Sequence, residues 1–132
     1  MQPRAGGSPQ AGGESDRDAA PAAAHEPAAL SAVAAARRTA RRHAATGSLG
    51  DAWTALRFAV GVVPDDAATW NLMGVVVAQR DGPIAAQRFF RAALALDPTC
   101  RPAQRNLERA TGGAAVSRGA WDLGPPDSEA QS

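Results

Sequence analysis

Apolar and small residues recur every three to four positions through the middle of this chain, and turn-forming residues interrupt them at regular intervals. Such spacing is typical of amphipathic helices, and no strand-like alternation competes with it. Proline opens or follows several segments, and Gly47, Gly82 and Gly112 end others. The predicted helices span about residues 27 or 30 to 45, 48 to 63, 67 to 81, 83 to 97 and 101 to 111. We therefore expect an all-α fold.

The two ends of the chain have a different composition from its middle. Residues 1–28 combine Gly, Pro, Ala, Ser and acidic residues with no large apolar side chain after Met1, and residues 112–132 contain Gly112–Gly113 and Gly124–Pro125–Pro126. Segments with little apolar surface to bury do not offset the entropy of ordering. We expect a disordered tail over 1–28, a helical domain over 29–111 and a disordered acidic tail over 112–132.

The helical region repeats itself with a period of about 34 residues. Shifting the chain by one period places Ala52 on Ala86, Leu56 on Phe90, Ala59 on Ala93 and Pro64 on Pro98. A period of this length indicates stacked pairs of helices, because each pair alone leaves an apolar face uncovered.

The second period carries a recognisable pattern. It reads Trp70-x2-Met73-Gly74-x2-Val77, then Ala86-x3-Phe90-x2-Ala93, then Pro98. This pattern resembles the tetratricopeptide repeat (TPR) family, in which Trp, Leu, Gly, Tyr, Ala, Phe, Ala and Pro stand at these spacings. The first period keeps only the second half of the pattern. The structural positions of the repeats are Ala52, Leu56, Ala59, Pro64, Trp70, Met73, Gly74, Val77, Ala86, Phe90, Ala93 and Pro98.

The resemblance implies antiparallel helix-turn-helix repeats at about 33–66 and 67–100, with a capping helix at about 101–111, in a short right-handed superhelix. Gly74 and Ala86 are expected where the helices of one repeat cross closely, and Trp70 and Phe90 between successive helices. Stacked repeats usually need about three units for stability. We therefore expect a partner or a second copy, as in a homodimer, to cover the first helix.

The same resemblance implies that the first helix of each pair lines a concave groove. Its groove-facing residues are then Arg37, Arg41, Asn71, Val75, Arg105 and Arg109. Spacing supports this assignment, because residues four apart share a helix face and Arg37, Asn71 and Arg105 are one period apart. Arg binds carboxylates bidentately, and an Asn amide can bind a peptide backbone. These residues predict a protein or peptide ligand that presents an acidic segment or a carboxylate terminus; the alternative is that the arginines are ordinary solvated surface residues.

Charge supports this expectation. All 14 basic residues are Arg, and residues 30–110 hold eleven Arg against six Asp or Glu, whereas both ends are acidic. Two interpretations of function stay open: an adaptor or assembly factor that binds an acidic segment, and an accessory subunit whose repeats complete a larger complex. A third, minor one is contact with nucleic acid through the cluster Arg37–Arg42, although no aromatic stacking platform accompanies it.

The C-terminal tail offers a ligand of its own. Asp122, Asp127, Glu129 and the terminal carboxylate match the charge of the groove, and Trp121–Asp122–Leu123 is the one tail segment with apolar side chains. Two alternatives stay open: a tail that docks in the groove of the same chain or a neighbour, and a tail that stays unbound.

Catalytic and cofactor chemistry find little support in the residues. His43 has no Ser, Cys or carboxylate in a triad-like relation, Gly47–Gly50 has no phosphate-binding Lys, and Cys100 lacks an activating base. Asp65–Asp66 is explained by a helix N-terminus. We expect no enzyme, no cofactor and no metal. The first residues lack a signal peptide's apolar stretch, and no run reaches 18 apolar residues, so a cytoplasmic location without membrane contact is expected.

Overall fold

A computed structural model describes residues 25–113 and 116–127 of the chain. The described residues contain five α-helices, one 3-10 turn and no strand, so the all-α prediction is confirmed. The elements are α2 (Pro27–Thr46), α3 (Leu49–Val62), α4 (Ala67–Asp81), α5 (Pro83–Leu96), α6 (Arg101–Thr111) and the 3-10 turn η2 (Arg118–Ala120). No helix in these two stretches has the length and apolar character needed to cross a bilayer.

The helix boundaries follow from local chemistry. Proline occupies the first turns of α2, α5 and α6, where the missing N–H costs nothing. Helix α2 ends at Gly47, whose φ of 84° is in the left-handed region, and the next N–H, that of Ser48, donates to the His43 carbonyl at 2.8 Å. The chain therefore reverses within two residues before α3 begins, close to the predicted boundaries.

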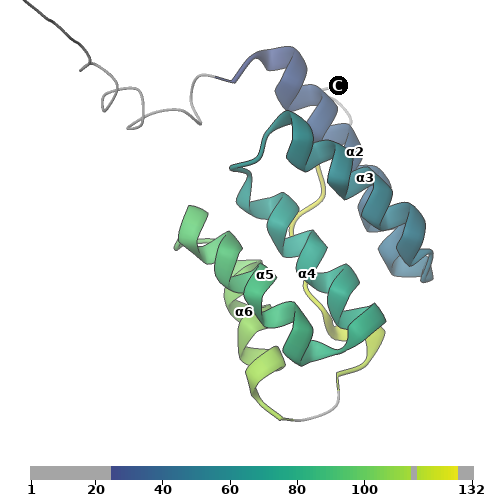
Figure 1. Cartoon of the computed structure of the whole chain (residues 1–132), viewed down its shortest axis with the longest axis vertical. Helices are drawn as coiled ribbons and strands as arrows, with labels where there is room; N and C mark the ends of the chain where they lie inside the picture. Colours follow the sequence, from purple (N-terminus) through teal and green to yellow (C-terminus); the bar gives the residue numbers. More distant parts are fainter. Residues whose placement is uncertain (1–24, 114–115, 128–132) are drawn as a thin grey trace, which may run out of the picture.

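Consecutive helices pack against each other, α2 with α3, α4 with α5, and α5 with α6 (Figure 1). Helix α4 also contacts α2, α3 and α6, so it lies at the centre of the bundle. Its residues from Asn71 to Ala78 are all buried, which suits a helix that is apolar on nearly every side.

The core is built largely from alanine. In the described part of the chain, half of the buried apolar residues are Ala, and the aromatic residues among them are Phe90 and Trp121. Small side chains let helix backbones approach closely. At Gly74 the approach is extreme, because a Cβ there would lie 2.4 Å from Cε1 of Phe90. The expected close crossing at Gly74 is therefore present.

Most of the predicted repeat positions are buried, with three exceptions. Trp70 is half-buried and packs beside Phe89, with ring centroids 6.2 Å apart. Pro64 and Pro98 are exposed, because each lies in a turn just after a helix end. Their contribution is to stop the helix rather than to fill the core.

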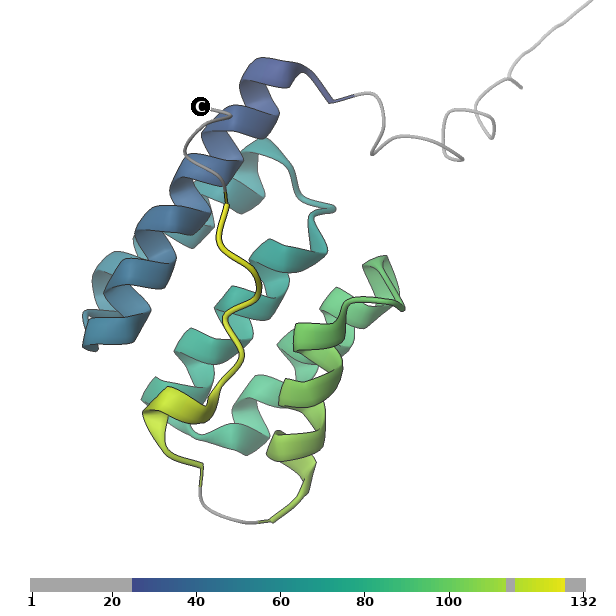
Figure 2. The ribbon, with the colours of Figure 1, turned by 180° about the vertical axis from the view of Figure 1, so that it is seen from behind.

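The C-terminal stretch differs from the expectation of a disordered tail over residues 112–132. Residues 116–127 run along the bundle between α2 and α6, in front of α4 (Figure 2). Trp121 is only 5% exposed, and the described part of the tail is therefore packed into the fold. A single buried indole outweighs the polar composition that surrounds it. The predicted disordered tail over 1–28 lies almost wholly outside the described residues.

Candidate functional site

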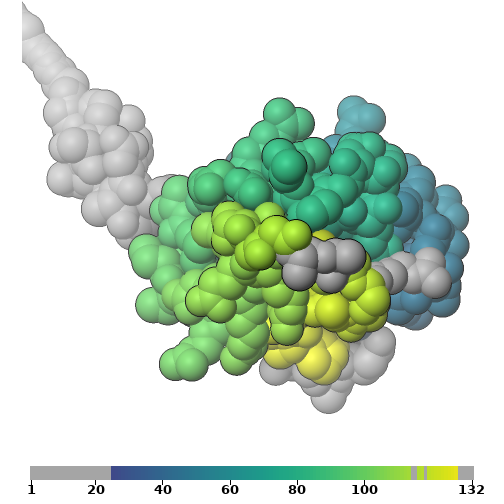
Figure 3. Space-filling view, turned by 90° about the horizontal axis from the view of Figure 1, so that it is seen from below, coloured from purple at the N-terminus to yellow at the C-terminus, as the bar shows by residue number. Residues whose placement is uncertain are grey.

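The predicted groove residues come from α2, α4 and α6, and the structure brings most of them against one stretch of chain. We call residues 121–127 the C-terminal segment. In the space-filling view it lies between α6 and α2 and fills the space between them (Figure 3). The alternative in which the tail docks in the groove of its own chain is thus the arrangement seen for this segment. Glu129 and the terminal carboxylate lie outside the described residues.

At the α2 end of the groove, two arginines bind one carboxylate. Arg37 donates to both oxygens of Asp127, from Nη2 to Oδ1 at 2.8 Å and from Nε to Oδ2 at 3.2 Å. Arg41 Nη1 donates to Oδ2 of the same residue at 2.6 Å. All three side chains are less than one-fifth exposed, so water screens these pairs only partly. The result is a defined two-arginine site for a carboxylate.

A second carboxylate, that of Asp66 at the start of α4, lies beside this site. Its Oδ2 accepts hydrogen bonds from Arg37 Nη1 and from the Thr69 hydroxyl, and it makes no cap to a backbone N–H. Asp66 is the N-cap residue of α4, as expected, but its carboxylate is paired with Arg37 and Thr69 and not with a backbone N–H. Asp66 instead holds Arg37 toward the groove.

The electrostatic surroundings favour the charged forms of Asp127 and Arg37. Burial raises the pKa of Asp127, but the hydrogen bonds and charges of Arg37 and Arg41 outweigh it and lower the pKa below its usual value. Burial also acts to lower the pKa of Arg37, and Asp127 together with Asp66 reverses that effect and raises it. A negatively charged group is the stable occupant between these arginines.

In the middle of the groove, the main chain of the segment is bound by two asparagines. Asn106 Nδ2 donates to the Asp122 carbonyl at 2.9 Å, while its Oδ1 accepts from the Asp122 N–H at 2.8 Å. Asn71 Nδ2 donates to the same carbonyl at 3.0 Å, and its Oδ1 accepts from Asn106 Nδ2 at 2.9 Å. Both asparagines are essentially fully buried. They recognise peptide backbone and not a particular side chain.

The backbone contacts extend one residue further. Arg41 Nε donates to the Leu123 carbonyl at 3.2 Å. Arg41 therefore binds both the main chain at Leu123 and the carboxylate of Asp127.

The Asp122 carboxylate has partners of its own. It accepts from the Gly124 N–H at 2.9 Å and from Arg105 Nη1 at 2.8 Å. Burial raises its pKa, but these two bonds and the charges of Arg105 and Arg109 lower it below the usual value. Arg109 is exposed and acts on the site through its charge.

The segment also has an apolar anchor. Trp121 stacks on Phe90 with ring centroids 5.8 Å apart and an interplanar angle of 25°. Both belong to a buried cluster that includes Val75 and Ala110. Val75, which is predicted to face the groove, is fully buried and belongs to the same apolar cluster as Trp121.

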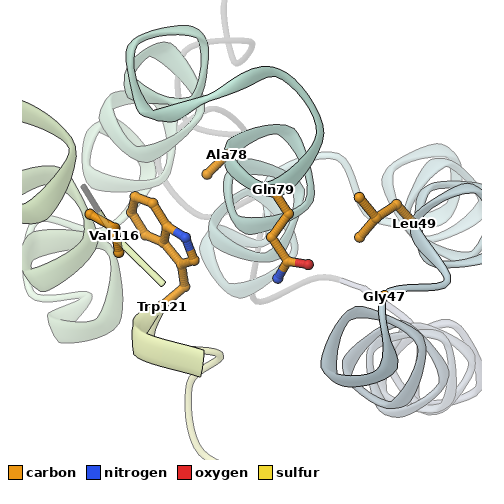
Figure 4. Close-up of a pocket in the computed structure, with 6 residues that line it drawn as sticks. All are labelled: Gly47, Leu49, Ala78, Gln79, Val116 and Trp121. Atoms are coloured by element: carbon orange, nitrogen blue, oxygen red, sulfur yellow. The ribbon is translucent and has the colours of Figure 1, made fainter. Parts of the chain in front are cut away.

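A cavity of about 400 Å³ opens beside Trp121 (Figure 4). It is lined by Gly47 from the α2–α3 turn, by Leu49 at the start of α3, by Ala78 and Gln79 from α4, and by Val116 and Trp121. Figure 4 shows the Gln79 amide between Trp121 and Leu49. Its Oε1 is buried without a hydrogen-bond partner.

Sequence reasoning missed Asn106, which makes the most direct backbone contacts in the site. A signal for it exists: Asn106 lies three residues after Ala103 and four before Ala110, so it occupies the buried face of α6. A fully buried amide at such a position requires partners. The partners themselves are far along the chain and have no sequence signature.

The described part of the chain shows no group of three or more His, Cys, Asp or Glu side chains that could hold a metal ion. Cys100 is half-buried at the start of α6, and burial raises the pKa of its thiol, which disfavours the reactive thiolate. Comparison of the chain with protein-family models, curated proteins and solved structures finds no match. Function is therefore inferred from the contacts within the chain.

Proposed function

We propose that this chain is a non-catalytic protein-interaction module of the TPR type, which binds an extended acidic segment of another protein in the groove between α2 and α6. The single observation that carries the proposal is the binding of residues 121–127 in that groove. Arginines bind its carboxylates and buried asparagines bind its main chain. A groove with these partners is complementary to any peptide of the same chemistry.

The repeat architecture is part of the proposal. Two features support it: consecutive helices pack as pairs, and Phe90 packs directly on Gly74 at the spacing of the TPR pattern. On this view α2–α3 and α4–α5 are two repeats of a short right-handed superhelix, and α6 is the cap. The groove is then its concave side, and the ligand lies along α2, α4 and α6.

The chemistry of the groove favours a protein ligand over other classes. Bidentate Arg–carboxylate pairs are among the stronger polar interactions, and the Asn pair matches one N–H and one carbonyl of a peptide unit. Arg37 and Arg41 are engaged with Asp127, which leaves the nucleic-acid alternative with less free positive charge in the cluster Arg37–Arg42. We therefore propose a cytoplasmic adaptor or assembly factor.

A second candidate, an accessory subunit that completes a larger complex, is favoured by exposed apolar side chains outside the groove. Phe58 on α3 is 55% exposed and Ile84 on α5 is 81% exposed. Such residues suit a contact with another subunit, including a second copy of the chain. Substitutions in the groove distinguish the two candidate functions, because they should weaken peptide binding by an adaptor but not the assembly of an accessory subunit.

The test uses a chain whose own segment is weakened by Trp121→Ala and Asp127→Asn, so that the groove is accessible. A fluorescent peptide with the sequence of residues 116–127 is titrated against it and followed by anisotropy. We expect saturable binding that weakens at least tenfold when Arg37→Glu and Arg105→Glu are added. Circular dichroism checks that each variant keeps its helical content. Binding that is unaffected by the charge reversals, or absent in the parent variant, would refute the proposal.

A further inference from the structure

The C-terminal segment is held at three places along its length, and each place recognises a different chemical group. Trp121 fills the apolar site on Phe90, the main chain of Asp122 lies between Asn71 and Asn106, and the Asp127 carboxylate lies between Arg37 and Arg41. Because these places lie on different helices, their separation sets the spacing that a ligand must have.

The first two places require adjacent residues. The aromatic residue is followed directly by a residue whose N–H and carbonyl both hydrogen-bond the Asn106 side chain. An aspartate is suited to that second position, because its carboxylate binds Arg105 and also accepts from the N–H two residues later. The chain is thereby bent over its own carboxylate.

The bend requires glycine. Gly124 has a φ of 82°, a conformation that side chains with a Cβ rarely adopt. A substitution of Gly124 would strain the backbone and would not create a steric clash. A Cβ at this position would have only ordinary contacts, the nearest being Pro102 Cγ at 3.7 Å. The turn directs the following residues toward α2, where Asp127 meets its two arginines three residues later.

These three requirements define a ligand. We propose that the partner carries an extended segment of the form aromatic-Asp-x-Gly-x-x-Asp, and that this segment replaces residues 121–127 in the groove. This inference rests on the proposed function and adds to it the partner's sequence chemistry and the identity of its competitor. The proposed occupant is a segment of another protein, because the charge of the groove and the spacing of its three binding places fit such a segment.

The resident segment competes with a free peptide for the groove, and the resulting loss of peptide affinity can be measured. The competitor is joined to the end of α6 by the nine residues 112–120, and a tether of this length gives effective concentrations on the order of millimolar. A free peptide therefore binds the intact chain more weakly than a chain whose tether has been cut. Cutting the tether tests the resident segment and the ligand together.

For the experiment, a protease site is inserted after Gly113, which is exposed and has open space around the position of its missing Cβ. The full chain is folded, shown by circular dichroism to match the unmodified chain, and then cut. A fluorescent peptide of residues 116–127 is exchanged into the groove, and unlabelled peptides compete with it. The matched competitors are Trp121→Ala, Gly124→Ala, Asp127→Asn, a peptide with one residue inserted after Gly124, and a scrambled peptide of the same composition.

We expect the native peptide to compete at least tenfold better than each altered peptide, and to bind the cut chain at least tenfold more tightly than the intact one. If the scrambled and lengthened peptides compete equally well, the groove binds acidic peptides but the spacing rule is wrong. If no peptide, native included, displaces the label, replacement by a partner is wrong. If the label never binds, the proposed function fails as well.

The same chain offers one rival occupant, the segment of a second copy. Sedimentation of the intact chain distinguishes it. We expect a monomer at micromolar concentration, with or without Trp121→Ala. A dimer that dissociates on Trp121→Ala would mean that segments are exchanged between copies and would overturn the choice of occupant.

Discussion

Single residues at the closest contacts carry the most specific structural demands. At Gly74 the helices α4 and α5 approach so closely that an added methyl group would overlap the Phe90 ring. We predict that Gly74→Ala destabilises the chain by about 1–3 kcal/mol, the usual cost of overpacking a core. Urea unfolding followed by circular dichroism measures this. The control is Gly61→Ala in α3, where a Cβ meets nothing within 4 Å.

The control is informative because both glycines are within helices. For Gly61→Ala we expect a gain of about 0.5–1 kcal/mol, since alanine loses less backbone entropy than glycine when a helix forms. Equal effects of the two substitutions would show that the contact between residue 74 and Phe90 does not contribute to the free energy of unfolding.

Asn106 makes a second residue-scale prediction. It is fully buried, and its Oδ1 is the acceptor for the Asp122 N–H. Asn106→Ala removes that acceptor and leaves buried polar groups unpaired, at a cost of about 1–3 kcal/mol. Hydrogen exchange measures it directly, because the Asp122 amide should lose its protection. Asn71→Ala is the matched control, since Asn71 bonds the Asp122 carbonyl and Asn106 but not the Asp122 N–H, and its loss should leave that amide protected.

Among the elements, the C-terminal segment has a stability that depends on pH. Its two aspartates have pKa values below the usual value in the folded state, because arginines and a backbone N–H outweigh the effect of burial. A lowered folded pKa means that the stabilisation is present above the unfolded value of 3.8 and is lost as pH falls below it.

We therefore predict that residues 116–127 leave the groove in acid while remaining bound at neutral pH. Fluorescence of Trp121, in a chain where Trp53 and Trp70 are replaced by Phe, should report this change as the pH falls below about 4. With Asp127→Asn the segment should be looser at neutral pH and respond less to acid. A pH response that is identical in the two chains would contradict the assignment of Asp127.

At the scale of the whole molecule, the C-terminal segment covers part of the helical bundle. On the proposed repeat arrangement, two helix pairs and one capping helix fall below the roughly three repeats that stacked arrays usually need. The sequence-based expectation was that a partner or second copy covers the first helix. The chain places Asp127 against α2 and Trp121 against Phe90, so part of such a cover comes from its own C-terminal segment.

This arrangement predicts that Trp121 stabilises the whole fold. Trp121→Ala should cost about 3 kcal/mol or more, as for other aromatic residues removed from a core, and lower the melting temperature of all helices together. Phe58→Ala is the control, because Phe58 is 55% exposed and surface substitutions usually change stability by less than about 0.5 kcal/mol. Calorimetry compares the two. Similar melting temperatures would show that the segment is not part of the cooperative unit.

The sequence by itself was enough to determine the five helices and their ends. Helix formation depends on neighbours within one or two turns, so Pro83, Gly47 and Gly82 mark boundaries wherever the helices later pack. The positions of Leu56, Ala86 and Phe90 on buried faces follow from the same short-range periodicity, and so does the common helix face of Arg37 and Arg41.

Only the tertiary structure decided what meets those arginines. The pairing of Arg37 with Asp127 joins residues 90 positions apart, and that of Asn71 with Asp122 joins residues 51 apart. Long-range pairs leave no periodic trace in the sequence, and a tail rich in Gly and Pro is read as disordered from its composition. The burial of one indole and two carboxylates reverses that interpretation, because their partners exist only once α2, α4 and α6 have been brought together.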